Sequence, residues 1–271
     1  MKNSYFENIT SLQNKKIKKL IELQNVKGRR NQDAFLFEGK KLFHEALKWN
    51  VKIEEIYLTN KILLTQEERL IKDLKFCNEQ SISMFCMDEA LMKKISLQEN
   101  PEGILIKAQK IKKNIRNLHS YVILEDVQDP GNVGTIIRTA DAMGFEGVIL
   151  TNKSADHYNE KVLRSAMGSV FHLAIERTDD LDEVVNFLKK RGICIYGSTL
   201  DGRPLQFYPE KLKNGFAIIV GNESKGMSIS MKKNCHELMK IPMQGNAESL
   251  NVGIASGIFM YELAKVNNII Q

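Results

Sequence analysis

Short apolar segments alternate with amphipathic segments along the whole chain, and this alternation constrains the fold more than any other sequence feature. Residues 121–126 (YVILED) and 216–220 (FAIIV) are expected to be strands, since they have the length and the β-branched content of buried strands. Helical patterns separate such segments, for example over residues 40–49 and 179–190. Strands that alternate with helices predict an α/β fold with a mostly parallel sheet.

The alternation is interrupted at residues 109–117, a charged stretch that is poor in large apolar side chains. We therefore expect a first domain over residues 1–108, a linker over 109–117 and a second domain over 118–271. A chain of 271 residues is long enough for two domains with their own cores. The first domain is predicted to be a small α/β sandwich, with a helix over residues 11–26 that carries an apolar stripe. Trp49, at the end of a predicted helix, is expected in the core and not as a base-stacking platform. The last helix of the chain is expected over residues 249–266.

Basic residues are concentrated in the first part of the chain. Residues 1–117 hold 23 of the 39 Lys and Arg residues but only 15 of the 33 acidic ones, and the net charge of the chain is +6. Basic clusters attract phosphate backbones, although a solvated surface explains any one cluster equally well. The segregation between the two parts of the chain favours a polyanionic partner.

Several classes of protein lose support from the sequence. The four cysteines form no CxxC pair and no histidine lies at zinc-ligand spacing from them, so we expect no metal site and a reducing compartment. No stretch approaches the roughly 20 apolar residues of a membrane helix, and the expected location is the cytoplasm. The loop that begins at Gly131 is not G-x-G-x-x-G, and no P-loop occurs, which disfavours NAD and ATP chemistry.

Three segments place glycine and polar residues directly after an apolar strand. They are residues 132–144 (NVGTIIRTADAMG), 219–227 (IVGNESKGM) and 241–256 (IPMQGNAESLNVGIAS). Ligands of open α/β sheets bind at the carboxyl ends of the strands, and glycine permits a close approach of the backbone. Three such loops from one domain can form one concave site.

In order and spacing, these segments resemble the three motifs of the SpoU (TrmH) branch of the SPOUT superfamily. Its members are S-adenosylmethionine-dependent RNA ribose 2′-O-methyltransferases. Residues 164–171 (RSAMGSVF) resemble the segment between the first two motifs, and the region around Phe37-Glu38-Gly39 resembles an RNA substrate-binding domain. The resemblance implies a catalytic α/β domain with a trefoil knot, otherwise nearly absent from proteins, and a homodimer formed through that domain.

The resemblance also implies roles for individual residues. S-adenosylmethionine would be contacted by Thr199, Gly221, Ile241 and Leu250, largely through backbone groups. The reacting end would be lined by Asn132, Arg138, Glu223, Ser249 and Asn251. The expected RNA-binding residues are Lys15, Lys16, Lys18, Lys19, Arg29 and Arg30.

Arg138 is the residue to which the family assigns activation of the ribose hydroxyl. A guanidinium has a pKa above about 12 and no acceptor site, so we expect Arg138 to hold a phosphate and to stabilise developing alkoxide charge. The proton acceptor is left open among the phosphate, water and a transiently deprotonated arginine. Asn132 and Ser249 also fit helix N-caps, and Glu223 fits an exposed turn.

The expected function is methyl transfer to a ribose 2′-hydroxyl of RNA, with ribosomal RNA favoured over transfer RNA by family analogy. A transfer RNA methyltransferase and a catalytically silent RNA-binding relative remain the alternatives. A small-molecule α/β enzyme is disfavoured by the charge of the first part.

Overall fold

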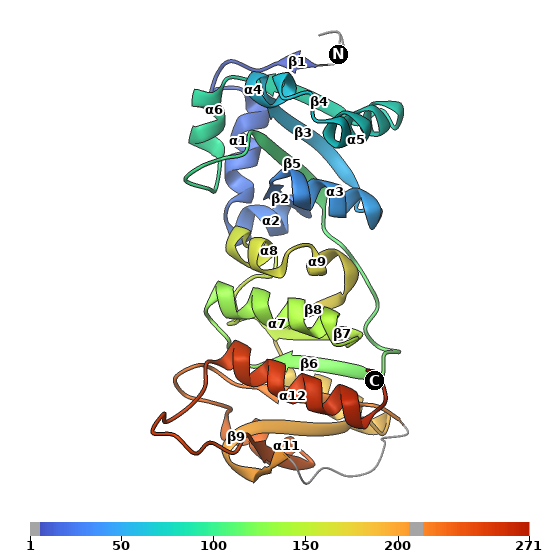
Figure 1. Cartoon of the computed structure of the whole chain (residues 1–271), viewed down its shortest axis with the longest axis vertical. Helices are drawn as coiled ribbons and strands as arrows, with labels where there is room; N and C mark the ends of the chain where they lie inside the picture. Colours follow the sequence, from blue (N-terminus) through green and yellow to red (C-terminus); the bar gives the residue numbers. More distant parts are fainter. Residues whose placement is uncertain (1–5, 206–213, 271) are drawn as a thin grey trace. The chain divides into compact units, whose positions relative to one another are not determined.

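The computed structural model describes residues 6–205 and 214–270, which divide into two compact units (Figure 1). Unit 1 is Met1–Ile111 and unit 2 is Lys112–Gln271. Within the segment expected to be a linker, Gln109 ends the last strand of unit 1, whereas Ile115 is buried in the core of unit 2. The segment is therefore anchored in both units.

Unit 1 contains a five-stranded sheet with the order β1-β4-β3-β5-β2. Its strands are β1 (Glu7–Asn8), β2 (Ala34–Glu38), β3 (Ile53–Thr59), β4 (Ser83–Met87) and β5 (Ile104–Gln109). The prediction of a mostly parallel sheet is wrong for this unit, because β5 runs antiparallel to both β2 and β3. The connection from β4 to β5 consists of a short helix and the loop over 96–103. It returns the chain to the end of the sheet at which β4 finishes, so β5 starts there and runs in the opposite direction.

The helices of unit 1 cover both faces of this sheet. They are α1 (Lys15–Leu23), α2 (Val26–Gln32), α3 (Lys40–Lys48), α4 (Asn60–Leu64), α5 (Glu68–Glu79) and α6 (Glu89–Ile95). Helices α1 and α6 lie on one side of the strands, and α3 and α5 lie on the other (Figure 1). Ile17, Leu20 and Leu23 of α1 form the expected apolar stripe and pack into one core cluster with residues of α6.

Two expectations for unit 1 are corrected. The helix predicted over residues 11–26 is shorter, since α1 covers only Lys15–Leu23. A second helix, α2, starts at Val26, because Asn25 acts as its N-cap and accepts a hydrogen bond from the Gly28 N–H at 2.9 Å. Trp49, expected in the core, is the C-cap of α3 and its side chain is 45% exposed.

Unit 2 contains a six-stranded sheet in which every neighbouring pair is parallel, as predicted, with the order β11-β9-β10-β6-β7-β8. Its strands are β6 (Ser120–Leu124), β7 (Gly147–Thr151), β8 (Ala174–Thr178), β9 (Cys194–Pro204), β10 (Phe216–Val220) and β11 (Glu237–Lys240). All five residues of β6 and of β10 are buried, which agrees with their continuous apolar sequences.

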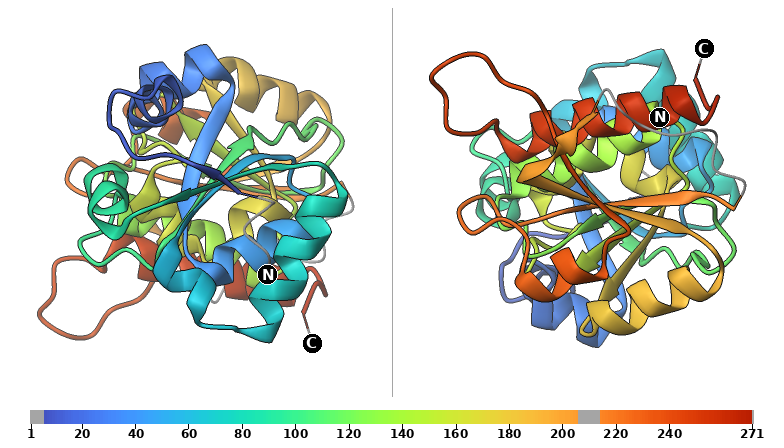
Figure 2. Two further views of the ribbon diagram at one scale, coloured as in Figure 1. Left: turned by 90° about the horizontal axis from the view of Figure 1, so that it is seen from above. Right: turned by 90° about the horizontal axis from the view of Figure 1, so that it is seen from below.

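The helices of unit 2 also cover both faces of its sheet (Figure 2). They are α7 (Pro130–Ala142), α8 (Glu160–Ala166), α9 (Ser169–His172), α10 (Leu181–Lys190), α11 (Ile229–Asn234) and α12 (Val252–Val266). Helices α10 and α11 pack on one face, where Val185 and Met231 join the strand residues Ile123 and Ile219 in one core cluster. Helices α7 and α12 pack against each other on the opposite face.

The strand order of unit 2 defines where a ligand can bind. From β6 the chain proceeds to β7 and β8 on one side, whereas β10, β9 and β11 lie on the other side. The loops that follow β6 and β10 therefore diverge at adjacent strand ends, which is the switch point where open α/β sheets bind ligands. The pairing of β11 with β9, followed by α12, is consistent with the expected trefoil knot.

Helix α12 begins three residues later than the sequence predicts. Its N-cap is Asn251, whose side chain accepts hydrogen bonds from the N–H groups of Gly253 and Ile254. Ser249 is therefore outside the helix and is not its N-cap. Among the described residues, none of the helices combines the length and apolar character needed to cross a bilayer.

Candidate active site

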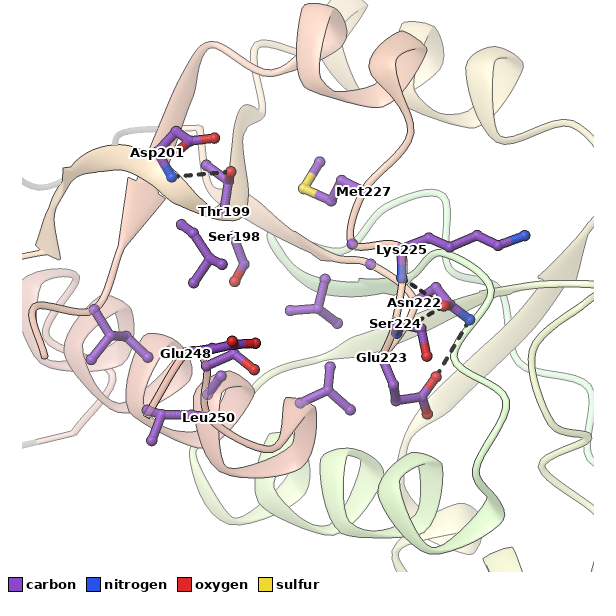
Figure 3. A pocket seen from close by; sticks show the side chains of 18 of the residues that line it. Ser198, Thr199, Asp201, Asn222, Glu223, Ser224, Lys225, Met227, Glu248 and Leu250 are labelled. Carbon is purple, nitrogen blue, oxygen red and sulfur yellow. Dashed lines mark hydrogen bonds between the residues drawn. The ribbon is translucent and has the colours of Figure 1, made fainter. Parts of the chain in front are cut away.

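The candidate active site is a pocket at the carboxyl-terminal side of the unit 2 sheet, with a volume of about 380 Å³ (Figure 3). Strand β9 contributes Ser198 to Asp201, the loop after β10 contributes Gly221 to Met227, and the loop before α12 contributes Ile241 and Glu248 to Leu250. The first turns of α12 complete the wall. Two of the three glycine-containing segments singled out in the sequence therefore line one pocket.

The loop after β10 is a tight turn that only glycine permits at its base. The backbone groups of Asn222 and Gly226 exchange two hydrogen bonds, at 3.2 and 2.9 Å, and Gly226 has a φ of +66°. A Cβ atom on Gly221 would lie 2.3 Å from the carbonyl carbon of Gly226 and from the Met227 nitrogen. The absence of a side chain at Gly221 thus keeps this wall of the pocket made of backbone.

Asn222 joins this loop to the one that follows β6. Its side-chain nitrogen donates to the carbonyl oxygen of Asp126 at 2.8 Å, and its side-chain oxygen accepts from the N–H groups of Ser224 and Lys225. Asn222 was not predicted as a site residue, although it lies between the two predicted residues Gly221 and Glu223. Asp126 has a φ of +58°, a left-handed conformation that is held by the bonds around it.

Glu223 binds the loop after β6 from the rim of the pocket. Its carboxylate accepts hydrogen bonds from the N–H of Gln128 at 3.2 Å, the N–H of Asp129 at 3.0 Å and the side-chain amide of Asn132 at 3.2 Å. Partial burial opposes the charged form, but these hydrogen bonds outweigh it and lower the pKa of Glu223 below that of an ordinary glutamate. The carboxylate is therefore charged at neutral pH.

Asn132 connects Glu223 to the start of α12. Its side-chain oxygen accepts a hydrogen bond from the side-chain nitrogen of Asn251 at 3.0 Å, so that Glu223, Asn132 and Asn251 form one chain of side chains. Asn132 lies in the first turn of α7, whose N-cap is Asp129. The interpretation of Asn132 as an N-cap is therefore wrong, and its side chain is used between the motifs.

Arg138 does not lie with these residues in the single chain. It is an exposed residue of α7 and is not among the residues that line the pocket. The neighbouring face of α7 is occupied by α12, since Cβ atoms built on Gly253 and Gly257 would contact Thr135 and Thr139. The structure brings Asn132, Glu223 and Asn251 together by hydrogen bonds, but of these three only Glu223 lines the pocket, and Arg138 is neither in this group nor in the lining.

The four residues expected to contact the donor, Thr199, Gly221, Ile241 and Leu250, all line the pocket, and so does Ser249. The same lining includes two carboxylates that were not predicted, Asp201 and Glu248, although each lies within two residues of a predicted site residue (Figure 3). The lining also includes Lys225 and Lys232, so backbone groups, apolar side chains and charged groups of both signs are available to a ligand that has polar and apolar parts. No cluster of metal-ligating side chains occurs in residues 6–205 and 214–270.

The basic residues expected to bind RNA differ in what they contact. Lys15, Lys18, Lys19 and Arg30 are exposed, whereas Lys16 forms an ion pair with Glu55 at 2.8 Å. Arg29 is only 4% exposed, and its guanidinium donates to the carbonyl oxygens of Leu23 and Gln24, each at 3.0 Å. The assignment of Arg29 to RNA binding is therefore corrected, because its side chain holds the α1–α2 junction.

The parallel sheet and the three-loop pocket define an α/β enzyme that binds its ligand at the switch point. The SpoU rRNA Methylase family model matches residues 119–261, and the MRM3-like substrate binding domain matches residues 14–106. The chain belongs to the SpoU rRNA methylase family. It is an enzyme that transfers a methyl group from S-adenosylmethionine to a ribose 2′-hydroxyl of RNA.

Similar proteins include both curated relatives and solved structures. The 23S rRNA (guanosine(2553)-2′-O)-methyltransferase RlmP of Bacillus subtilis is 36% identical over 94% of this chain and 98% of its own length. The AdoMet-bound rRNA methyltransferase from Sinorhizobium meliloti has a TM-score of 0.86 and 27% identity, covering 98% of this chain and 100% of that one. A putative RNA methyltransferase of the TrmH family from Porphyromonas gingivalis has a TM-score of 0.79 and 28% identity, covering 93% and 98%.

Proposed function

We propose that the RNA substrate is ribosomal RNA, that the pocket holds the methyl donor, and that unit 1 contributes to RNA binding. The likeness to RlmP over nearly the whole of both chains supports this choice of substrate more than any other observation. The exposed side chains of Lys15, Lys18, Lys19 and Arg30 are available to phosphate groups. A ribosomal RNA substrate would place the enzyme in the cytoplasm.

The chain's own residues would contribute mainly alignment. S-adenosylmethionine supplies an electrophilic methyl group on a sulfonium, so the hydroxyl must be aligned with it and must lose its proton. Both polar atoms of the Asn132 side chain are used, one by Glu223 and one by Asn251. We assign to this chain of side chains the positioning of the loops around the reacting atoms, and to Ser249 a contact at the open rim.

We assign to Arg138 a contact with the RNA phosphate and stabilisation of the developing alkoxide. Arg138→Ala should abolish methyl transfer and leave the affinity for S-adenosylmethionine unchanged, because the residue does not line the pocket. Tritiated donor and total RNA measure the transfer, and calorimetry measures donor binding. An equal loss of donor affinity would remove Arg138 from the catalytic role.

The same labelling experiment tests the substrate. We expect label in ribosomal RNA from cells that lack the enzyme, because its target ribose is unmethylated there. We expect no label in RNA from cells that contain the enzyme. Label confined to transfer RNA would replace the proposed substrate with transfer RNA. No label in any RNA from the wild-type enzyme would favour a catalytically silent RNA-binding relative.

We also propose a homodimer formed through unit 2, in which Arg138 of one copy acts at the pocket of the other. Two observations support it. Arg138 is exposed outside the pocket of its own chain, and the adjacent helix α12 exposes Ile254 and Tyr261 at 58% and 46%. Apolar side chains exposed along a helix that also forms a pocket wall fit a self-complementary interface.

A mixing experiment separates action within one chain from action across the dimer. Arg138→Ala lacks the arginine, and Gly221→Ala blocks the donor wall, so each homodimer should be inactive. If Arg138 acts across the interface, refolding the two variants together restores about a quarter of the activity, since half of the dimers have one complete site. Mixtures that stay inactive would contradict action across the dimer.

A further inference from the structure

One end of the unit 1 sheet brings together loops that are distant in sequence. At this end β2 and β3 begin and β5 finishes, as the pairs Ala34–Gln109 and Ile53–Ala108 show. Backbone hydrogen bonds connect the loops, from Gln109 to the carbonyl of Lys52 at 2.9 Å and from Lys110 to the carbonyl of Asp33 at 3.0 Å. The donor pocket of unit 2 uses none of these residues.

Two large aromatic side chains are exposed at this same end. Helices α3 and α5 each connect two parallel strands, so they run in the same direction, and they are joined by the His44–Asp73 pair at 3.3 Å. Trp49 caps the C-terminus of α3 and Phe76 lies in the last turns of α5. Their side chains are 45% and 48% exposed. These rings, at the C-terminal ends of two helices that run in the same direction, provide flat apolar surface at one end of the unit.

Basic side chains lie on the elements and loops at this end of the sheet, and Lys48 Nζ is 5.9 Å from the centre of the Trp49 ring. The exposed ones are Arg30, Lys48, Lys52 and Lys75, and Lys110 is partly buried. The acidic side chains nearby are mostly paired, since Asp73 contacts His44 and Glu45 lies 3.9 Å from Lys48. Exposed Glu79 at the end of α5 is the main opposing charge. The surface is therefore aromatic and basic, which suits a partner with flat rings and negative charge.

We propose that this aromatic and basic end of unit 1 binds a single-stranded segment of the substrate RNA, with bases stacked on Trp49 and Phe76 and phosphates held by the surrounding basic side chains. The inference rests on the proposed function and adds to it the form of RNA that unit 1 recognises. Bases within a duplex are stacked on each other, so only unpaired bases can use such rings. Stacking depends little on base identity, so this surface would select unpaired RNA and not a sequence.

The chain provides its own reporter, because Trp49 is the only tryptophan. The full-length protein is titrated with an unstructured single-stranded RNA oligonucleotide, and with the same strand annealed to its complement. We expect the single strand to quench the Trp49 emission and to protect it from acrylamide. The duplex should have much smaller effects at equal occupancy, which is measured independently by anisotropy of end-labelled RNA.

Variants test whether the rings contribute to affinity. Trp49→Ala and Phe76→Ala should each weaken binding of the single strand by roughly tenfold, whereas Trp49→Phe should keep most of the affinity. Leu64→Ala is the matched control, because Leu64 is an exposed apolar residue (79%) on α4, which follows the opposite end of β3. Far-ultraviolet circular dichroism and urea unfolding of each variant, compared with the wild type, verify that unit 1 is folded, since the donor pocket lies in unit 2 and does not report on it.

The outcomes separate this inference from the proposed function. If RNA binds and is methylated but Trp49 emission and acrylamide access do not change, this surface is not the RNA site, although the function stands. If duplex RNA protected Trp49 from acrylamide as well as the single strand does, the proposed stacking of bases on Trp49 and Phe76 would be wrong. Equal losses of RNA affinity in Trp49→Ala and Leu64→Ala would also contradict it. If the protein binds no RNA at all, both proposals fail, and the exposed rings belong to a protein contact.

Discussion

At the scale of single residues, the site depends on side chains that bind backbone groups of another loop. The Glu223 carboxylate, for example, accepts two N–H groups from the loop after β6 as well as the amide of Asn132. The sequence indicated that Glu223 and Asn132 belong to the site. It could not indicate that they contact each other, because hydrogen bonds between loops depend on the strand order.

Glu223→Gln should lower both methyl transfer and stability. The folded state lowers the pKa of Glu223, so the charged carboxylate contributes stability above the pKa of an unfolded glutamate, and this contribution is lost as the pH falls through the folded value. The difference in Tm between the wild type and Glu223→Gln should therefore be largest near neutral pH and should shrink on acidification. Thermal melts between pH 7 and about 3 measure it. Glu248→Gln, on the exposed loop before α12, is the control, and a difference that grows in acid would contradict the assignment.

Arg29 and Arg30 are neighbours with different expected roles. Arg29→Ala should lower the free energy of unfolding by about 1–3 kcal/mol, because the carbonyls of Leu23 and Gln24 lose their donor. Arg30→Ala should leave stability nearly unchanged. It should instead reduce the slope of log affinity for single-stranded RNA against log salt by about 0.7. Urea unfolding measures the loss of stability, and RNA titrations at several salt concentrations measure the slope. If Arg29→Ala changed the slope and Arg30→Ala lowered stability, the roles assigned to the two residues would be wrong.

At the scale of elements, sequence patterns predicted the buried strands well and the helix boundaries less well. Strands such as β6 and β10 are uniformly apolar and were identified within a residue or two. The start of α12 was misplaced, because Ser249 and Asn251 are both good N-caps and only the contact with Asn132 distinguishes them. Helix α2 was not predicted, because its sequence VKGRRNQ has one apolar side chain, Val26, and therefore no apolar stripe.

The turn after β10 gives a prediction at this scale. Gly221→Ala should abolish measurable donor binding, because its Cβ would lie 2.3 Å from backbone atoms of the same turn. Stability should fall by about 1–3 kcal/mol as the turn shifts. Gly245→Ala is the matched control in another loop of the site, since no heavy atom lies within 4 Å of its Cβ position. Titration calorimetry with S-adenosylmethionine compares them, and normal binding by Gly221→Ala would refute the close packing.

At the scale of the whole molecule, the two-part layout could be expected from the interrupted alternation and the uneven charge. The mixed sheet of unit 1 could not, because a strand sequence does not specify the direction of its neighbours. The exposure of Trp49 was also missed, since an isolated tryptophan at a helix end fits a core equally well. The position of Arg138 outside the pocket depends on how α7 packs on α12.

The proposed dimer gives a prediction for the whole molecule. Ile254→Asp should convert the dimer to a monomer and abolish methyl transfer, because it places a charge in an interface that must bury this side chain. Leu64→Asp introduces the same charge at a more exposed apolar position of unit 1 and should leave the mass unchanged. Sedimentation and the tritium assay measure mass and activity. A wild-type monomer that is fully active would exclude the dimer.

The hydrogen bond between Asn132 and Asn251 joins residues that are 119 positions apart. During translation, α7 and the β6 loop emerge long before Asn251 can cap α12 and complete the chain of side chains to Glu223. A nascent or prematurely terminated polypeptide that lacks α12 therefore has neither this bond nor the pocket wall formed by Val252, Ala255 and Phe259. Incomplete translation products should thus be unable to modify RNA, because their donor pocket has no wall on this side.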